Sequence, residues 1–150
     1  MECIMAESRR NSVPVSLVRG IYLSQRKLNH LGAEVAKDYD LQLSEMDLIN
    51  TLGNTRGMKM GSVATHMLIS APSVTRIVKR IEERGLVTRM RSKQSDREVI
   101  VSLTPEGEAL FEKCYPHICD EVAKFFGEVL TGDEQQQLLQ RLNQLTPESD

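Results

Sequence analysis

The chain has 150 residues, enough for one domain whose hydrophobic core needs neither disulfides nor a metal. Its hydrophobic and charged fractions, 40% and 27%, are those of an ordinary soluble globular protein. No apolar stretch approaches the roughly 20 residues of a membrane helix. The first residues lack the layout of a signal peptide, so we expect a cytoplasmic protein with no membrane association.

The net charge of −2 conceals an uneven distribution along the chain. Residues 71–97 carry 8 basic and 3 acidic side chains, whereas residues 98–150 carry 3 basic and 11 acidic ones. A basic segment within an acidic protein indicates a local contact with a polyanion such as nucleic acid. A solvated basic face would explain the charge equally well.

The N-terminal half of the chain has the apolar spacing of helices. A long first helix is predicted over about residues 15–37, longer than most helices of globular proteins. A shorter helix begins at Leu43, with Ser44 as its capping residue, and ends at Gly53. A third helix fits residues 60–67.

A fourth helix and two strands follow. Ser70 can cap the helix, and Gly85 is placed to end it. The period then changes, and residues 86–90 and 98–103 have the composition of strands. Residues 91–97 between them are polar and predict the loop of a hairpin.

Two further helices complete the chain. Thr104 can cap a second long helix that runs to about Phe126, with a kink expected at Pro116, and a last helix starts near Thr131. The order of elements predicts a mainly α-helical protein with a small β-hairpin wing. Residues 42–103 would form a winged helix-turn-helix lobe between long N- and C-terminal helices.

The fourth helix separates an apolar face from a basic one. Its apolar stripe consists of Val74, Ile77, Val78 and Ile81. The opposite side presents Pro72, Arg76, Lys79 and Glu83, flanked by Ser73, Thr75 and Arg80. A helix that reads the major groove of DNA needs such a division, because one face fixes its angle while the other meets bases and phosphates. A plain amphipathic helix with a solvated basic face is the alternative.

Individual side chains of this helix suit different parts of a duplex. Arg76 can bond a guanine edge bidentately, and Thr75 can contact a thymine methyl or a phosphate. Ser70 and Ser73 lie near the helix N-terminus, where phosphate contacts are favoured.

The hairpin loop is also basic. Arg91, Lys93 and Arg97 face a single acid, Asp96, which could orient an arginine. A hairpin beside a recognition helix can insert an arginine into the adjacent minor groove, where a narrow groove concentrates negative potential. An ordinary exposed turn is the alternative, but helix and hairpin together favour DNA binding.

Several segments in this order resemble one family. They are Val63-Ala64, Ser70 to Arg89, Ser95-Asp96-Arg97 and Leu103 to Gly107. The chain thereby resembles the MarR family of bacterial winged helix-turn-helix transcriptional regulators, over about residues 15–146. One departure is Lys93-Gln94-Ser95, where the family often has an acid before the Asp-Arg pair.

The resemblance implies an obligate homodimer, with dimerisation helices over about 15–37 and 104–146. It implies a recognition helix at about 71–84 and a wing at about 86–103. The positions that match the family's motifs there are Thr75, Arg76, Asp96 and Arg97. The implied function is a regulator of double-stranded operator DNA, a repressor more often than an activator. A winged-helix module that binds a protein partner and not DNA is the alternative.

The resemblance also implies release from DNA by a small molecule or an oxidant. Effectors of the family bind between the dimerisation helices and the DNA-binding lobe, and Tyr22, Arg26, His30 and Tyr115 could line such a cleft. For Tyr22 and Tyr115, the interpretation as core residues is favoured over a place in the cleft.

The cysteines and histidines indicate no further chemistry. Cys3, Cys114 and Cys119 contain no Cys-x-x-Cys motif, and small buried or idle thiols explain them. A redox enzyme using Cys114 or Cys119 is the other alternative, for which His117 could lower the pKa of a thiol. We expect no metal site, no cofactor and no enzymatic activity.

Overall fold

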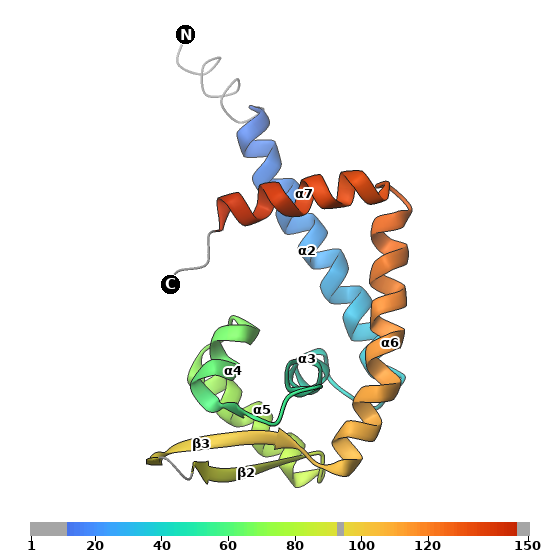
Figure 1. Ribbon diagram of the computed structural model, residues 1–150. Helices are drawn as coiled ribbons and strands as arrows, with labels where there is room; N and C mark the ends of the chain where they lie inside the picture. The colour runs from blue at the N-terminus through green and yellow to red at the C-terminus, as the bar shows by residue number, and fades with distance from the viewer. Residues whose placement is uncertain (1–11, 93–94, 147–150) are drawn as a thin grey trace.

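The computed structural model describes residues 12–92 and 95–146. Within them, the chain forms six helices and three strands, arranged as a lobe from which two long helices extend (Figure 1). The lobe contains α3 (Leu43–Leu52), β1 (Met58–Lys59), α4 (Met60–Met67), α5 (Ala71–Glu83), β2 (Val87–Ser92) and β3 (Ser95–Leu103). The remaining elements are the long helices α2 (Val13–Lys37) and α6 (Pro105–Gly127), and α7 (Gly132–Leu145). The predicted winged helix-turn-helix architecture is confirmed.

The core of the lobe lies where α3, α4 and α5 meet the inner ends of the strands. Its fully buried side chains include Leu48, Ile49 and Leu52 of α3, Val63 of α4, Val74, Val78 and Ile81 of α5, and Val87 and Val101 of the sheet. Four apolar residues of α5 are buried, and they are those of the predicted stripe. The opposite face of α5 is therefore directed away from the core.

Two glycines lie at the ends of the segment that connects α5 to α6: Gly85 follows α5, and Gly107 is in the first turn of α6. Gly85 has φ +74°, a conformation that glycine adopts without steric strain, and it follows the last turn of α5. At Gly107, a Cβ atom would lie 2.0 Å from the carbonyl oxygen of Leu86. Thr104 joins the two regions, because its hydroxyl donates to Gly85 O (2.7 Å) and accepts from Gly107 N (3.1 Å).

The wing belongs to an antiparallel sheet of three strands in the order β1-β3-β2. The prediction of a loop over residues 91–97 is wrong, since β2 continues to Ser92 and β3 begins at Ser95, which pair with each other. β1 was not predicted, and it pairs Met58 with Val101. Backbone hydrogen bonds hold β2 and β3 together, so the residues near their turn need no alternation of apolar and polar side chains. β1 has two residues, too few to show a period in the sequence.

The start of α3 also differs from the prediction. Gln42, and not Ser44, is the N-cap residue, and it forms a capping box with Glu45. The Glu45 carboxylate accepts a hydrogen bond from Gln42 N at 2.8 Å. A glutamate has the reach to bond back to the N-cap backbone, and Glu45 stands three residues after Gln42, as this motif requires.

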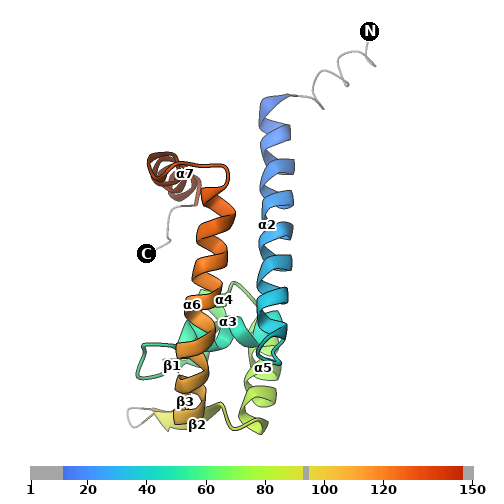
Figure 2. The ribbon, with the colours of Figure 1, turned by 90° about the vertical axis from the view of Figure 1, so that its right-hand side faces the viewer.

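The long helices are attached to the lobe at one end only. The buried residues of α2 are Gly32, Val35 and Ala36, all near its C-terminus. α2 and α6 contact each other and diverge away from the lobe (Figure 1). α6 is continuous through Pro116 and changes direction about midway, whereas α7 lies beyond the end of α6 and away from α2 (Figure 2).

Candidate nucleic-acid interface

The outer face of α5 carries the side chains that were predicted to contact DNA. Pro72, Thr75, Arg76 and Lys79 are exposed, and Ser73 is half-buried. Ser70 precedes the helix, and its hydroxyl lies 2.9 Å from that of Ser73. These groups share one surface because the buried stripe fixes the rotation of the helix.

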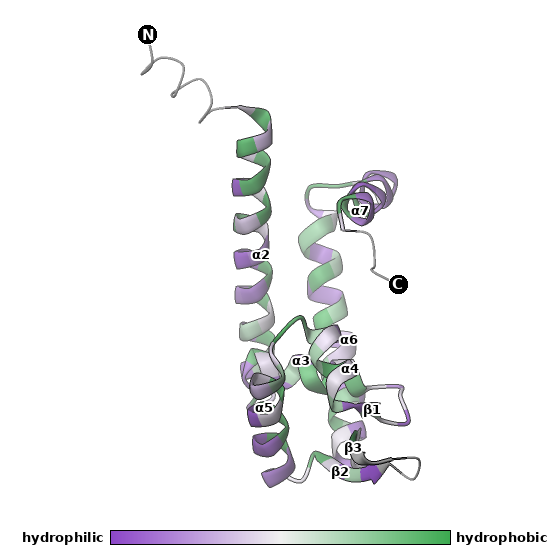
Figure 3. Cartoon of the chain, turned by 90° about the vertical axis from the view of Figure 1, so that its left-hand side faces the viewer, coloured by the Kyte–Doolittle hydropathy of each residue, from purple (hydrophilic) through white to green (hydrophobic). Residues whose placement is uncertain are grey.

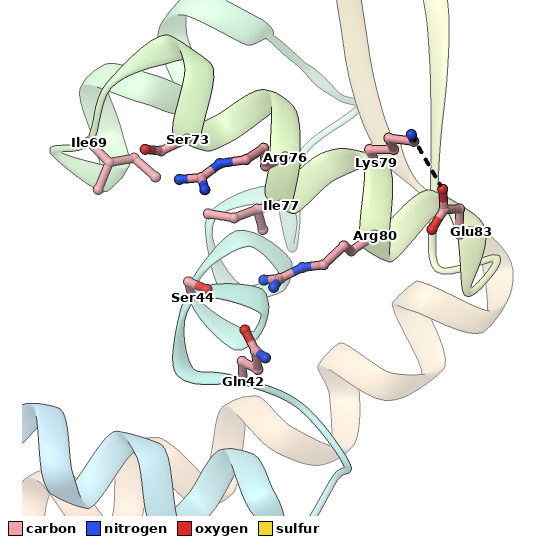
Figure 4. A pocket seen from close by; sticks show the side chains of 9 residues that line it. All are labelled: Gln42, Ser44, Ile69, Ser73, Arg76, Ile77, Lys79, Arg80 and Glu83. Carbon is pink, nitrogen blue, oxygen red and sulfur yellow. Dashed lines mark ion pairs between the residues drawn. The ribbon is translucent and has the colours of Figure 1, made fainter.

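A groove of about 630 Å³ separates this face from the start of α3 (Figure 4). We call it the α3–α5 groove. It is lined by Gln42, Ser44, Ile69, Ser73, Arg76, Ile77, Lys79, Arg80 and Glu83. The structure thus brings four of the predicted site residues together, and it adds Gln42 and Ser44, which sequence reasoning missed. Nothing in the sequence places the start of α3 opposite α5.

Arg80 differs from its neighbours on α5. Its Nε atom lies 3.3 Å from Glu45 Oε1, and its side chain extends toward the start of α3 (Figure 4). Arg84, one turn later, places Nη1 3.5 Å from Glu45 Oε2 and Nη2 3.5 Å from Asp40 Oδ2. These ion pairs tie α5 to α3 and to the segment that follows α2.

The wing is fastened to α5 by a second ion pair. Arg89 on β2 donates from Nε to Glu82 Oε2 at 2.9 Å, and this hydrogen bond lowers the pKa of the Glu82 carboxyl. The backbone of Asp96 and Arg97 belongs to β3. Their side chains, and all of Lys93, lie outside the described part of the chain.

Of the four residues expected to bind an effector, two line a common groove. Arg26 and His30 line a groove of about 980 Å³ between α2 and α6, the α2–α6 groove. The complete lining is Leu23, Ser24, Arg26, Lys27, His30, Leu31, Phe125 and Glu128. Tyr22 and Tyr115 are not part of it, and neither is a core residue, since they are 68% and 43% exposed. Tyr115 instead stacks on Phe111, with 4.9 Å between ring centroids.

The thiol at position 114 is not activated. Cys114 is buried, its Sγ lies 3.7 Å from Asn50 Oδ1, and burial raises the pKa of the thiol. The possibility that His117 lowers this pKa is therefore wrong for Cys114. His117 Nδ1 instead lies 3.1 Å from the hydroxyl of Tyr39. Cys119 is exposed, and Cys3 lies outside the described residues.

The described residues contain no group of three metal-ligating side chains. Nor does any helix among them combine the length and the apolar character needed to cross a membrane.

Comparison with known proteins agrees with this geometry. The model of the MarR family matches residues 41–99, which cover most of the lobe. The uncharacterized HTH-type transcriptional regulator YwoH of Bacillus subtilis (strain 168) is 32% identical over 114 residues, 76% of this chain and 80% of that protein. The homoprotocatechuate degradative operon repressor of Escherichia coli is 28% identical over 110 residues, 73% of this chain and 74% of the repressor.

Solved structures show the same fold. A mutant of MarR from E. coli complexed with operator DNA superposes with a TM-score of 0.80 at 22% identity, over 89% of this chain and 95% of that one. NadR in complex with 4-hydroxyphenylacetate has a TM-score of 0.77 at 25% identity, over 93% and 98% of the two chains.

A helix-turn-helix lobe with a basic outer helix and a wing, carried on long helices, defines a DNA-binding regulator of transcription. The chain belongs to the MarR family. It is accordingly a transcriptional regulator and not an enzyme.

Proposed function

We propose that the protein is a homodimeric repressor that binds a palindromic operator and is released from DNA by a small anionic molecule. DNA binding through α5 is supported by the separation of this helix into a buried apolar face and an exposed basic face. Val74, Val78 and Ile81 are fully buried, while Arg76 and Lys79 are exposed on the other side. In this arrangement Arg76 reads a base in the major groove, Lys79 contacts phosphate, and Arg97 of the wing enters the minor groove.

The long helices support the dimer. No residue of α7 is buried, although the helix carries exposed leucines at positions 138, 139, 142 and 145. The N-terminal half of α2 likewise exposes Val13, Val15, Leu17, Val18, Ile21 and Leu23. Figure 3 shows hydrophobic residues recurring along this helix between hydrophilic ones. Apolar surface left exposed on two helices outside the lobe is characteristic of an interface between subunits.

A two-fold dimer presents two copies of α5, which favours an operator with two inverted half-sites about one helical turn apart. Repression is the mode of action named for the E. coli relative that governs a degradative operon. A repressor of this kind acts by occupying its operator, so gene expression requires a signal that releases it from the DNA.

The α2–α6 groove supports release by an anion. Arg26, Lys27 and His30 contribute positive or protonatable groups to its wall, and Leu31 and Phe125 contribute apolar surface. A small aromatic carboxylate matches this combination. The ligand of the NadR structure, 4-hydroxyphenylacetate, belongs to this chemical class.

Selection of genomic DNA tests the operator. Fragments retained by the protein should share an inverted repeat, and the protein should bind that repeat far more tightly than a scrambled duplex of equal length. Retention without any common sequence would reject specific operator binding.

A panel of aromatic carboxylates, 4-hydroxyphenylacetate among them, tests the effector class. Each acid is compared with its neutral amide for its ability to raise the melting temperature and to release the repeat. We expect activity from acids only, lost in Arg26→Ala and retained in Arg19→Ala, an exposed arginine of α2 outside the groove lining. Equal activity of an acid and its amide would contradict an anion site.

A further inference from the structure

Glu45 is chemically unusual in this protein. Among the described residues it is the one charged residue that is buried, with 5% of its surface exposed. We infer that Glu45 is a positioning residue for operator specificity: it orients the recognition helix α5 and withholds Arg80 from non-specific contact with DNA phosphates. The inference rests on the proposed DNA reading by α5.

The contacts of Glu45 explain how a carboxylate is kept in this position. Its carboxylate accepts hydrogen bonds from Gln42 N at 2.8 Å and from Arg84 Nη1 at 3.5 Å. It also forms an ion pair with Arg80, whose Nε lies 3.3 Å from Glu45 Oε1. A buried carboxylate is costly unless its oxygens are hydrogen-bonded and its charge is paired. The backbone contact serves the start of α3, whereas Arg80 lies on α5 and Arg84 is the C-cap residue of α5. The second role of Glu45 is therefore to join the two helices.

The spacing of the arginines gives this clamp a direction. Arg76 and Arg80 lie on α5, and Arg84 follows as its C-cap residue. The three are four residues apart, so they follow one another along one side of the helix and its C-terminal end. Arg80 and Arg84 are held by Glu45, while Arg76 makes no ion pair with the described residues and lines the α3–α5 groove. The three arginines share one helix backbone. Because Glu45 holds Arg80 and Arg84, it fixes the rotation of α5 and with it the direction in which Arg76 leaves the helix.

The same contact controls the charge that α5 offers to DNA. The Arg80 side chain is 45% exposed at the edge of the α3–α5 groove, between Arg76 and Lys79 on one side and Glu45 on the other. Without its carboxylate partner, its guanidinium would be available to any phosphate. Such a contact strengthens binding to sequences that lack the correct bases. Because loss of the Glu45 contact also loosens the placement of α5 on the repeat, the repeat does not gain equally, and discrimination falls.

Glu45→Gln tests this arrangement with the smallest change of shape. Glutamine also completes a capping box at this position, so α3 keeps its start while the charge is lost. The probes are the inverted repeat obtained by the genomic selection and a scrambled duplex of equal length and composition. We expect the preference for the repeat to fall by about tenfold, the value of one good bidentate base contact.

Affinity for the scrambled duplex distinguishes a positioning role of Glu45 from a role in folding stability alone. Glu45→Gln should bind it more tightly than the wild type, with a salt dependence steeper by about one unit for each released arginine. A loss of folding stability alone cannot increase affinity for DNA. Glu121→Gln is the matched control, because it removes a carboxylate from an ion pair with Lys124 on α6, remote from α5; it should leave preference and salt dependence unchanged.

Arg80→Gln supplies a second, independent test. We expect it to reduce the preference for the repeat without strengthening binding to the scrambled duplex. In the Glu45→Gln background it should return the scrambled affinity toward the wild-type value. If Arg80 is instead a direct DNA contact, Arg80→Gln alone weakens binding to both duplexes and flattens the salt dependence, which would overturn the inference.

DNA reading by α5 and the role of Glu45 can be rejected separately. A wild-type protein that prefers neither duplex would reject DNA reading by α5 and this inference with it. A wild-type protein that prefers the repeat, together with a Glu45→Gln variant that prefers it equally, would reject the role of Glu45 alone.

Discussion

Single side chains on α5 have different surroundings, and their expected contributions to binding differ accordingly. Lys79 Nζ lies 3.9 Å from Glu83 Oε1, an exposed pair of little energetic weight, so the ammonium can exchange this partner for phosphate. Arg76 lines the α3–α5 groove and has the planar donor geometry that matches a guanine edge.

We therefore expect Arg76→Ala to weaken binding to the repeat by about 1–3 kcal/mol and to relax the preference at one base position. Lys79→Ala should weaken binding almost uniformly across sequences. Binding isotherms on the repeat and on single-base variants measure both. An equal, sequence-independent loss in the two variants would show that Arg76 does not read a base.

Leu68 is strained in the turn between the two helices of the helix-turn-helix. It has φ +54° and ψ +37° at the end of α4, and 90% of its surface is exposed. A bulky side chain is unfavourable in this left-handed conformation, whereas glycine is not.

Leu68→Gly should therefore stabilise the protein by about 0.5–1 kcal/mol, since the relief of strain exceeds the added flexibility of the unfolded chain. Urea unfolding provides the measurement. Ala109→Gly, an exposed position inside α6, is the control and should destabilise by about 1 kcal/mol. Destabilisation of both variants would mean that the turn carries no strain.

At the scale of elements, the wing and α5 act as one unit. Arg89 joins β2 to α5 through Glu82, and Lys59 of β1 pairs with Glu98 of β3 at 2.7 Å. The sheet is thereby held at a defined place beside the recognition helix. In the proposed complex, a wing fixed in this way could reach the minor groove next to the major groove that α5 would occupy.

Arg97→Ala should consequently cost affinity most on operators with A·T-rich flanks, where the minor groove is narrow. It should also flatten the salt dependence by about one unit, with the melting temperature unchanged. Asp96→Ala should reproduce part of the effect if Asp96 orients an arginine. Isotherms over a salt series on A·T-rich and G·C-rich flanks test this; wild-type behaviour of Arg97→Ala would remove the wing from DNA recognition.

At the scale of the whole molecule, the lobe has a core of its own while α7 and the outer part of α2 do not. The exposed leucines of α7 lie on one side of that helix, and Gln140 lies on the opposite side. Burial of that side against a second copy would complete the fold and set the distance between the two lobes.

Light scattering at micromolar concentration should give a mass near twice 16.9 kDa. Replacing Leu139 and Leu142 together by Glu should shift the mass toward one chain and abolish binding to the inverted repeat, because a charge cannot be buried unpaired. Gln140→Glu should do neither. A wild-type mass of one chain would contradict the dimer.

Local pattern was sufficient for much of this molecule. The apolar stripe of α5, its end at Gly85 and the cap at Thr104 all depend on residues within a few positions of one another, and each was predictable. The helices, the hairpin and their order follow from the same local signals, and the order is what indicated a winged helix-turn-helix.

Long-range contacts were decided by the tertiary structure alone. The ion pairs of Glu45 with Arg80 and Arg84 join residues more than thirty positions apart, the pairing of β1 with β3 is equally remote, and no period in the sequence encodes either. Whether an arginine faces DNA or a buried carboxylate, and whether a tyrosine lines a groove or stacks on its neighbour, depends on which surfaces meet. The sequence by itself therefore determined the helices, the hairpin and the basic face of α5, whereas packing determined which charges of α5 remain available to DNA.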